Sequence, residues 1–244
     1  MNNKLKTKKS CLVCGHRGAS GQAPENTLAA FRLAIDMGVD MCELDVQQTR
    51  DVRFAVIHDD TLGRTTNGRG AVWKRDLAEL QKLDAGRWFG KSFAGERVPS
   101  LEEGIAVARG RIKLNIELKV HGHERNVAGL LVDTIRRESF EDECLVSSFD
   151  HKLADEVKSI APEFAVGYIF GAQEFDERIF FGPVDILSAH FPLITEKFMK
   201  KVRDHHKQIH AWTVDRPEDM RRMIEIGVDV IITNFPDRLL HPAF

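Results

Sequence analysis

Short apolar runs alternate with longer amphipathic stretches along almost the whole chain, and this alternation restricts the folds open to it. Short apolar runs bounded by turn residues are typical of buried strands, and amphipathic stretches are typical of covering helices. The expected strands are 11–16, 41–46, 112–117, 144–148, 165–170, 185–190, 208–214 and 229–233. Strands and helices that alternate in this way favour an α/β fold with a parallel sheet.

The amphipathic stretches between these strands predict helices at 27–37, 101–109, 124–138, 151–160, 196–205 and 217–226. For the first helix we expect Asn26 as the N-cap and Gly38 just beyond the end. The last helix begins at Pro217 and stops at Gly227, which is the usual placement of these two residues.

Eight strands with intervening helices suggest a closed barrel. A chain of 244 residues suits a single (β/α)₈ barrel, whose usual length is about 250 residues. A doubly wound open sheet is the alternative, but the sequence from Gly15 to Gly18 lacks the third glycine of its phosphate-binding turn. We therefore predict one domain over residues 1–244, folded as a distorted (β/α)₈ (TIM) barrel.

One segment does not fit the repeat. Phe54–Ile57 reads as a ninth short strand, too close to the second for a parallel crossover, so we expect an antiparallel hairpin. A turn centred on Asp51 and Val52 would place His58 opposite Asp45. Residues 60–100, rich in glycine and aromatic residues, then form an insertion that we expect to pack over one end of the barrel.

The charge balance excludes several partners. A net charge of −2 and a pI of about 6.6 give no electrostatic reason to expect nucleic acid or an anionic membrane. No run of 18 apolar residues predicts a membrane span, and the apolar run Cys11–Cys14 is too short for a signal peptide. We expect a cytoplasmic protein, while the oligomeric state is not predicted.

Four cysteines are too few for a disulfide scaffold in a chain of this length. They are Cys11, Cys14, Cys42 and Cys144. We expect them to be buried reduced thiols.

Acidic residues stand where the second and third strands end, which is the end of a barrel that carries the active site. Glu43 and Asp45 alternate along one strand and so share a face, and Glu117 ends the next barrel strand. Three converging carboxylates would raise one another's pKa unless a cation compensates them. Oxygen ligands suit magnesium, calcium or manganese. The alternative is that these are solvated acids, or ion-pair partners of Arg17 and Lys119.

Histidines and cations accompany these acids. His16 ends the first strand and His58 ends the hairpin, and an imidazole titrates near neutral pH, as general acid–base catalysis requires. Arg17 and Lys119 suit an anionic, phosphate-bearing substrate, and Trp212 lies at the end of the seventh strand.

His190 ends the sixth strand, and whether it lines the pocket is not predicted. Seven other histidines are expected in packing or on the surface. They are His121, His123, His151, His205, His206, His210 and His241.

Several motifs, in the right order between about residues 12 and 238, resemble the glycerophosphodiester phosphodiesterase family. They are His16-Arg17-Gly18, Pro24-Glu25-Asn26-Thr27, Glu43-Leu44-Asp45-Val46, His58-Asp59-Asp60-x-Leu62-x-Arg64-Thr65-Thr66-x-Gly68-x-Gly70, Asn115-Ile116-Glu117-Leu118-Lys119, Trp212-Thr213-Val214 and Gly227-Val228-Asp229.

The resemblance implies a distorted barrel that hydrolyses glycerophosphodiesters to glycerol 3-phosphate and an alcohol, as in the short cytosolic members. It also implies an insertion like that at 60–100. The implied roles are acid and base for His16 and His58, metal binding for Glu43, Asp45 and Glu117, and substrate binding for Arg17, Lys119 and Trp212.

Two positions depart from the family pattern. Asp51-Val52 replaces the usual Asp-Gly of the hairpin, and because valine resists a positive φ we expect a different type of turn. Asp215 stands where asparagine is common, which concerns details of substrate binding.

Two other functions are alternatives to glycerophosphodiester hydrolysis. Lysophospholipase D-type hydrolysis of lysophospholipids needs an apolar groove, and Trp88, Phe89 and Phe93 are candidates to line one, or to form the insertion's own core. A non-catalytic barrel that binds phosphate metabolites would have lost a histidine or a metal-binding acid, and neither is lost here. We therefore favour a hydrolase, acting on diesters with a small headgroup.

Overall fold

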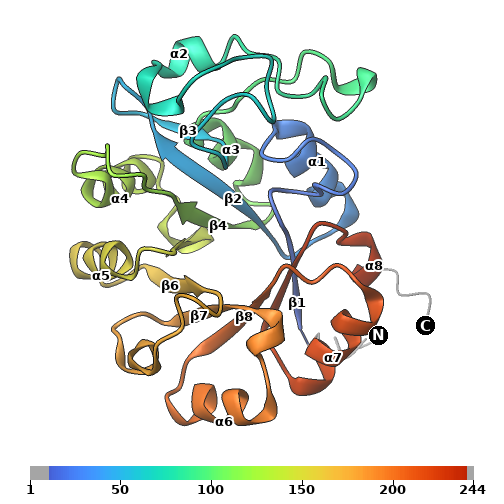
Figure 1. Cartoon of the computed structure of the whole chain (residues 1–244), viewed down its shortest axis with the longest axis vertical. Helices are drawn as coiled ribbons and strands as arrows, with labels where there is room; N and C mark the ends of the chain where they lie inside the picture. The colour runs from blue at the N-terminus through green and yellow to red at the C-terminus, as the bar shows by residue number, and fades with distance from the viewer. Residues whose placement is uncertain (1–10, 241–244) are drawn as a thin grey trace, which may run out of the picture.

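The computed structural model describes residues 11–240, and they form a closed barrel of eight parallel strands (Figure 1). In sheet order the strands are β1 (Leu12–Gly15), β9 (Val230–Thr233), β8 (Gln208–Trp212), β7 (Ile186–His190), β6 (Ala165–Phe170), β5 (Cys144–Ser148), β4 (Lys113–Leu118) and β2 (Met41–Gln48). Pairing of β1 with β2 closes the barrel. The predicted fold class is confirmed.

Helices surround the barrel (Figure 1). All six expected helices are present, as α1 (Leu28–Met37), α3 (Leu101–Ala108), α4 (Val127–Arg137), α5 (His151–Ile160), α6 (Glu196–Asp204) and α7 (Pro217–Ile226), with short α2 (Leu77–Leu80) and α8 (Asp237–Leu240) besides. Five 3₁₀ segments complete the described elements: η1 (Val72–Lys74), η2 (Lys91–Phe93), η3 (Glu141–Glu143), η4 (Glu177–Phe181) and η5 (Phe191–Leu193). Between residues 11 and 240 no helix combines the length and apolarity that crossing a membrane requires.

Two helix starts differ from the sequence prediction. Thr27, not Asn26, caps α1, because its side chain accepts the Ala30 N–H while the Asn26 side chain is turned toward Asp45. Helix α4 begins after Glu124, whose carboxylate accepts three backbone N–H groups of the preceding loop. The predicted start of α7 at Pro217 is confirmed.

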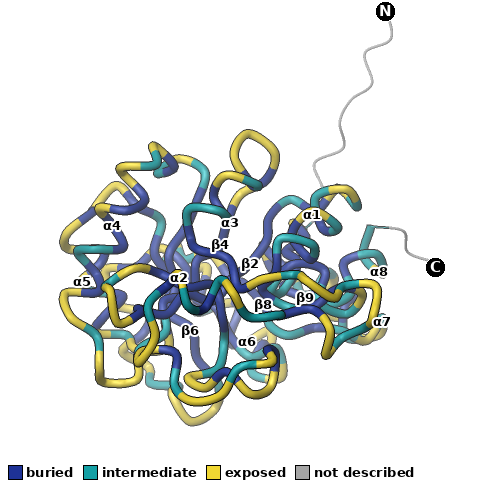
Figure 2. Tube along the Cα trace, turned by 90° about the horizontal axis from the view of Figure 1, so that it is seen from above, coloured by how far each residue is buried: buried dark blue, intermediate teal, exposed yellow. Residues whose placement is uncertain are grey.

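Burial divides each strand into two faces, and buried residues concentrate on the strands in Figure 2. The outward faces pack against the helices in the main core. The inward faces form a separate apolar cluster of Cys14, Met41, Leu145, Ile186, Val230 and Ile232 in the barrel interior. Ile209 and Ala211 of β8 belong to the outer core, so His210 between them faces inward. Polar side chains occupy the carboxyl-terminal ends of these inward faces, above the apolar cluster.

All four cysteines are free, as predicted, and three of them are buried. Cys11 is only partly buried.

The hairpin strand β3 (Phe54–Val56) pairs antiparallel with β2, as expected. The predicted register is wrong by one residue, because Val46 faces Val56 and the Asp45 carbonyl accepts from Ile57 rather than lying opposite His58. The cause is the turn. The Thr49 N–H donates to the Arg53 carbonyl, which leaves a three-residue loop, 50–52, in which Val52 has a φ of 60°. Valine therefore adopts the conformation that we expected it to avoid.

Residues 60–100 form the insertion, which includes α2 and lies beside β3 and α1 in Figure 1. It shares a small apolar core with β3, made of Ala55, Ile57, Leu62, Val72, Leu77, Leu80, Ala85 and Val98. Trp88, Phe89 and Phe93 are not part of this core, since they contact one another edge to edge and Trp88 is 43% exposed.

Candidate active site

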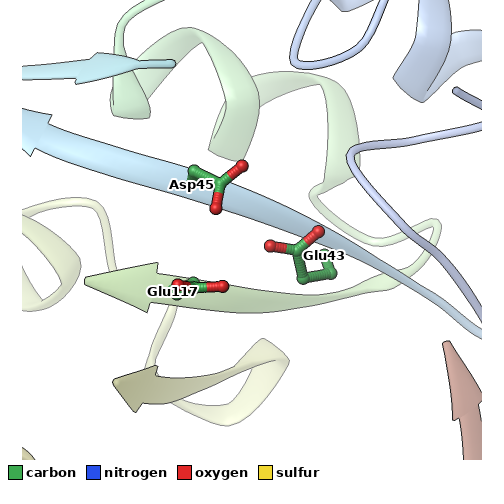
Figure 3. Close-up of side chains that lie close together, drawn as sticks. All are labelled: Glu43, Asp45 and Glu117. Atoms are coloured by element: carbon green, nitrogen blue, oxygen red, sulfur yellow. The ribbon is translucent and has the colours of Figure 1, made fainter. Parts of the chain in front are cut away.

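Three carboxylates meet inside the barrel mouth. Glu43 and Asp45 project from β2 and Glu117 projects from the adjacent β4, so that the three carboxyl groups face one another in Figure 3. The parallel register pairs Asp45 with Glu117, and one oxygen of each acid lies within 4.8 Å of the others. All three residues are buried.

The electrostatics of these acids are unequal. Burial, together with the charges of Asp45 and Glu117, raises the pKa of Glu43 well above its ordinary value. Burial and the Asp45 charge raise the pKa of Glu117 to about 7. Burial opposes ionisation of Asp45 as well, but Lys119 and Arg17 outweigh it and hold the Asp45 pKa below its ordinary value. Asp45 is thus the fixed negative charge of the cluster.

Two cations border the acids. Arg17 follows β1, and its Nε lies 3.1 Å from Asp45 Oδ2, while its backbone N–H donates to Glu43 Oε2 at 2.8 Å. Lys119 Nζ lies 3.1 Å from Asp45 Oδ1 and also pairs with Glu117. The contacts of Asp45 with Arg17 Nε and Lys119 are ion pairs without hydrogen-bond geometry. Arg17 and Lys119 therefore flank the acids on two sides.

Glu43 Oε1 is buried and has no hydrogen-bond partner. A buried carboxylate oxygen without a partner costs free energy unless a cation or a donor reaches it. Together with the oxygens of Asp45 and Glu117 it offers an all-oxygen donor set, which fits a magnesium, calcium or manganese ion.

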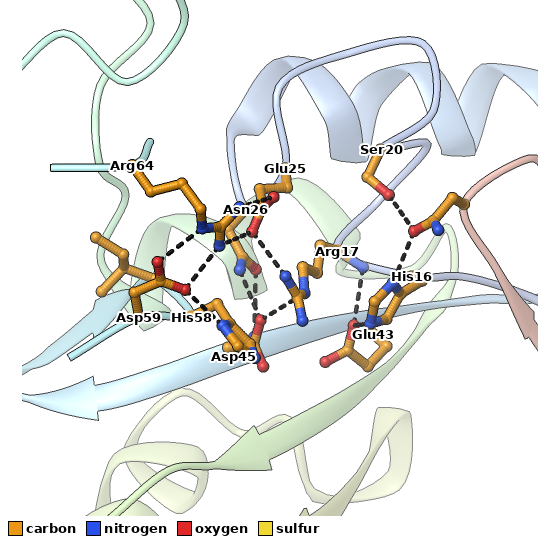
Figure 4. Close-up of polar contacts among 12 residues, drawn as sticks. His16, Arg17, Ser20, Glu25, Asn26, Glu43, Asp45, His58, Asp59 and Arg64 are labelled. Atoms are coloured by element: carbon orange, nitrogen blue, oxygen red, sulfur yellow. Dashed lines mark hydrogen bonds and ion pairs between the residues drawn. The ribbon is translucent and has the colours of Figure 1, made fainter. Parts of the chain in front are cut away.

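His16, labelled in Figure 4, is fixed by a network at the end of the neighbouring strand β9. The Asn234 side chain donates to Asp215 Oδ2 at 2.7 Å, so its carbonyl oxygen is turned to His16 Nδ1, also at 2.7 Å. His16 Nε2 then faces Glu43 Oε2 at 3.9 Å. Burial and the Arg17 charge lower the pKa of His16 to about 4, which makes the imidazole neutral at pH 7.

His58 is fixed by its neighbour in sequence. Its Nδ1 lies 2.7 Å from Asp59 Oδ1. Burial lowers the pKa of His58, the positive charges of Lys119 and Arg17 lower it further, and Asp45 and Asp59 oppose this. Both imidazoles therefore have Nδ1 engaged by an oxygen and Nε2 left for a substrate.

One cavity of about 130 Å³ joins these groups. Its lining includes His16, Arg17, Glu43, His58, Glu117, Lys119 and Trp212. Asp45 is fully buried behind this lining. The Trp212 indole donates to the Ser188 carbonyl and packs edge-on against Phe149, which forms another part of the wall. All eight residues proposed from the sequence thus lie in or directly behind one cavity.

A larger cavity of about 630 Å³ adjoins the first and shares Glu117, Lys119 and Phe149 with it. Its lining is mainly polar: Ser148, Asp150, His151, Lys152 and Glu174, beside Leu118 and Val120. Trp88, Phe89 and Phe93 line neither cavity.

The sequence did not predict the roles of several residues of the site. Buried Asn26 donates to Asp45 Oδ2 at 2.7 Å, although the sequence suggested a helix cap. Asn234 and Asp215 orient His16 from 218 and 199 positions away, respectively, a separation that no local pattern reports. Asp59 and Arg64 stood in a recognised motif without an assigned role.

The other histidines take varied places. His190 packs against Trp212 and is not among the residues of the smaller cavity. His210 is fully buried in the barrel, His121 is exposed, and His241 lies outside the described residues. Aromatic rings pack against His123, His151 and His205.

Proteins of known family resemble this chain in sequence and in structure over most of its length. Residues 16–238 match the model of the glycerophosphoryl diester phosphodiesterase family. A glycerophosphodiester phosphodiesterase of Caldanaerobacter subterraneus is 40% identical, over 94% of this chain and 96% of its own. A phosphodiesterase of Oleispira antarctica, solved in complex with the product sn-glycerol-3-phosphate, is 33% identical with a TM-score of 0.88, over 93% of this chain and 94% of its own. A glycerophosphodiester phosphodiesterase structure from Agrobacterium tumefaciens is 30% identical with a TM-score of 0.82, over 94% of this chain and 99% of its own. The chain therefore belongs to the glycerophosphoryl diester phosphodiesterase family.

Proposed function

We propose that this protein hydrolyses glycerophosphodiesters to glycerol 3-phosphate and an alcohol, with a divalent cation as cofactor and two histidines as acid and base. The observation that carries the proposal is the meeting of three carboxylates, two cations and two histidines at one cavity in the barrel mouth. The product bound by the Oleispira antarctica relative supports the same reaction.

Glu43, Asp45 and Glu117 would hold the cation, because they form a buried all-oxygen set and Glu43 Oε1 lacks another partner. When bound, such an ion neutralises charge on the phosphate and polarises its oxygens. Arg17 and Lys119 lie next to these acids and supply two permanent positive charges for the remaining phosphate oxygens.

The two histidines act as general acid and general base. With Nδ1 held by Asn234 and Asp59 respectively, His16 and His58 each present Nε2 to a bound diester. One, with an unprotonated Nε2, removes a proton from the attacking hydroxyl. The other must carry a second proton, on Nε2, and gives it to the departing oxygen, which is otherwise a poor leaving group. The attacking hydroxyl belongs either to water or to C2 of the substrate's glycerol, and a cyclic phosphate detected among the products identifies the second case.

The residues that line the outer cavity favour a small polar alcohol over a lipid. An acyl chain needs an apolar groove, whereas the outer cavity is lined mainly by charged and polar side chains. Trp88, Phe89 and Phe93, the insertion's candidates for such a groove, line neither cavity. This supports diesters such as glycerophosphoethanolamine and glycerophosphocholine as substrates.

A product assay tests the proposal. Purified protein is incubated with glycerophosphoethanolamine, glycerophosphocholine and monomeric lysophosphatidylcholine, each with magnesium, calcium, manganese or a chelator, and glycerol 3-phosphate is quantified. We expect a higher kcat/KM for the water-soluble diesters than for the lysophospholipid. A higher value for the lysophospholipid would favour the lipid substrate, and metabolite binding without turnover would favour the non-catalytic barrel.

A further inference from the structure

A continuous series of charged contacts runs from His58 to the acids of the proposed metal site (Figure 4). It passes through Asp59, Arg64, Glu25 and Arg17 before it reaches Asp45. The two ends of this series already have proposed roles, because His58 transfers a proton and Arg17 and Asp45 belong to the phosphate and metal sites. Nothing in the proposed chemistry accounts for Arg64, which comes from the insertion.

Arg64 makes two bidentate ion pairs at once. It donates to both oxygens of Asp59, at 2.6 and 2.7 Å, and to both oxygens of Glu25, at 2.7 and 2.8 Å. A guanidinium has a planar array of donors that fits carboxylates in this way, and a lysine ammonium does not. Arg64 therefore fixes the orientation of both carboxylate planes.

Fixing Asp59 also fixes His58. An ionised carboxylate only accepts hydrogen bonds, and the hydrogen bonds and charge of Arg64 lower the pKa of Asp59 so that it stays ionised. The proton of neutral His58 must then sit on Nδ1, 2.7 Å from Asp59 Oδ1, which leaves Nε2 as the reactive nitrogen. Without Arg64, the Asp59 side chain, already 24% exposed, would be free to turn toward solvent.

We propose that Arg64 is a positioning residue that holds His58 in its Nδ1–H tautomer through Asp59, and that the insertion thereby forms a working part of the active site. The kinetic part of this inference rests on the proposed function. The second carboxylate, Glu25, connects Arg64 to Arg17, whose guanidinium it contacts at 2.8 Å. The same side chain thus links the acid–base group to the cation beside Asp45.

The competing explanation is that Arg64 only fastens the insertion to the barrel. Arg50 provides a matched control, because it makes a bidentate pair with Asp76 of the insertion, at 2.8 and 2.7 Å, and contacts neither histidine. The two arginines are also similarly exposed, at 44% for Arg64 and 55% for Arg50. A purely mechanical role predicts similar effects for the two substitutions.

Kinetics separate these explanations. For Arg64→Gln we expect kcat to fall roughly 10–100-fold, with a smaller change in KM. This is the usual cost of losing a residue that orients a functional side chain without touching the substrate. Arg64→Lys should recover only part of this loss, because lysine cannot pair with both carboxylates bidentately. Arg50→Gln should keep wild-type kcat. Equal kcat values for Arg64→Gln and wild type, or equal losses in both glutamine variants, would overturn the proposal.

Nitrogen-15 NMR of the histidine side chains gives a readout that does not depend on turnover. The His58 signals are assigned by their absence from a His58→Gln spectrum. In wild type and Arg50→Gln they should report a single Nδ1–H tautomer, and in Arg64→Gln and Asp59→Asn a mixture of tautomers. An unchanged tautomer in Arg64→Gln would contradict the inference. If wild type were inactive on every diester but the tautomer still depended on Arg64, the proposed function would fail and the positioning role would stand.

Discussion

At the scale of single residues, the two candidate catalytic histidines have the same arrangement built from different partners. His16 is held by the neutral Asn234 amide and His58 by the Asp59 carboxylate. Loss of a positioned proton-transfer group costs about 10²–10⁴ in rate. We predict that His16→Ala and His58→Ala each lower kcat by at least 10²-fold, in a steady-state assay on a glycerophosphodiester, with unchanged far-UV circular dichroism. Near-native turnover in either folded variant would show that its assigned role is wrong.

His210 makes a second prediction at this scale. It is fully buried inside the barrel, its Nδ1 has no hydrogen-bond partner, and burial lowers its pKa to about 4. As the pH falls below about 6.5, the unfolded chain binds a proton at this position before the folded protein does. The contribution of His210 to the free energy of unfolding should therefore fall between pH 6.5 and pH 4, by about 2 kcal/mol at pH 5.

Urea unfolding at pH 7 and pH 5 measures this effect. His210→Leu removes the titrating group at similar volume, so it should lose about 2 kcal/mol less than wild type over this interval. His121→Leu, at an exposed position, serves as the control and should behave like wild type. Identical losses in wild type and His210→Leu would contradict the prediction.

At the scale of elements, the β2–β3 hairpin contains an unfavourable residue. Val52 has a φ of 60°, where a β-branched side chain clashes with its own backbone at a cost of about 1–2 kcal/mol. Glycine relieves the clash but adds about 0.4–1 kcal/mol of entropy to the unfolded chain. We predict that Val52→Gly raises the free energy of unfolding by roughly 0.5–1 kcal/mol, measured by urea denaturation. Val52→Ala retains Cβ and should gain less, and a less stable Val52→Gly would rule the argument out.

The hairpin also illustrates what the sequence could predict. Strand alternation placed Glu43 and Asp45 on one face, and terminal residues marked both ends of α7, because these signals are local. The register failed because it depended on the conformation of one residue, Val52. Asn26 was misassigned as a cap because its side chain contacts Asp45, a tertiary partner that competes with the local preference.

At the scale of the whole molecule, closure of the barrel brings the site together. Strands β2, β4, β6, β7, β8 and β9 contribute lining residues to the smaller cavity, and β1 leads directly to His16 and Arg17. Asn234 follows β9, and the insertion contributes Arg64. The first and last strands meet only because β1 pairs with β9 as well as with β2. A candidate site shared among so many elements should be sensitive to the stability of the whole barrel, and its ligands should in turn affect that stability.

The proposed cation makes this coupling measurable. Glu43, Asp45 and Glu117 are buried together, so a divalent ion that binds them binds the folded state only. At a hundredfold excess over Kd such binding adds about 2.7 kcal/mol, or roughly 5–10 °C in Tm for a chain of this size. We predict that a chelator lowers Tm and abolishes activity, and that magnesium, calcium or manganese restores both.

Glu117→Gln should reduce the metal-dependent shift in Tm, because it removes one ligand charge while keeping the shape of the side chain. Glu102→Gln is the control, since Glu102 is partly buried and pairs with Arg53 away from the cluster. Differential scanning fluorimetry of the three proteins, with chelator and with each metal, compares the shifts directly. If Glu43, Asp45 and Glu117 hold the ion, the metal-dependent rise in Tm should be equal in wild type and Glu102→Gln and smaller in Glu117→Gln. If neither chelator nor added metal changes Tm and activity persists, the three acids do not bind a cation that the protein needs.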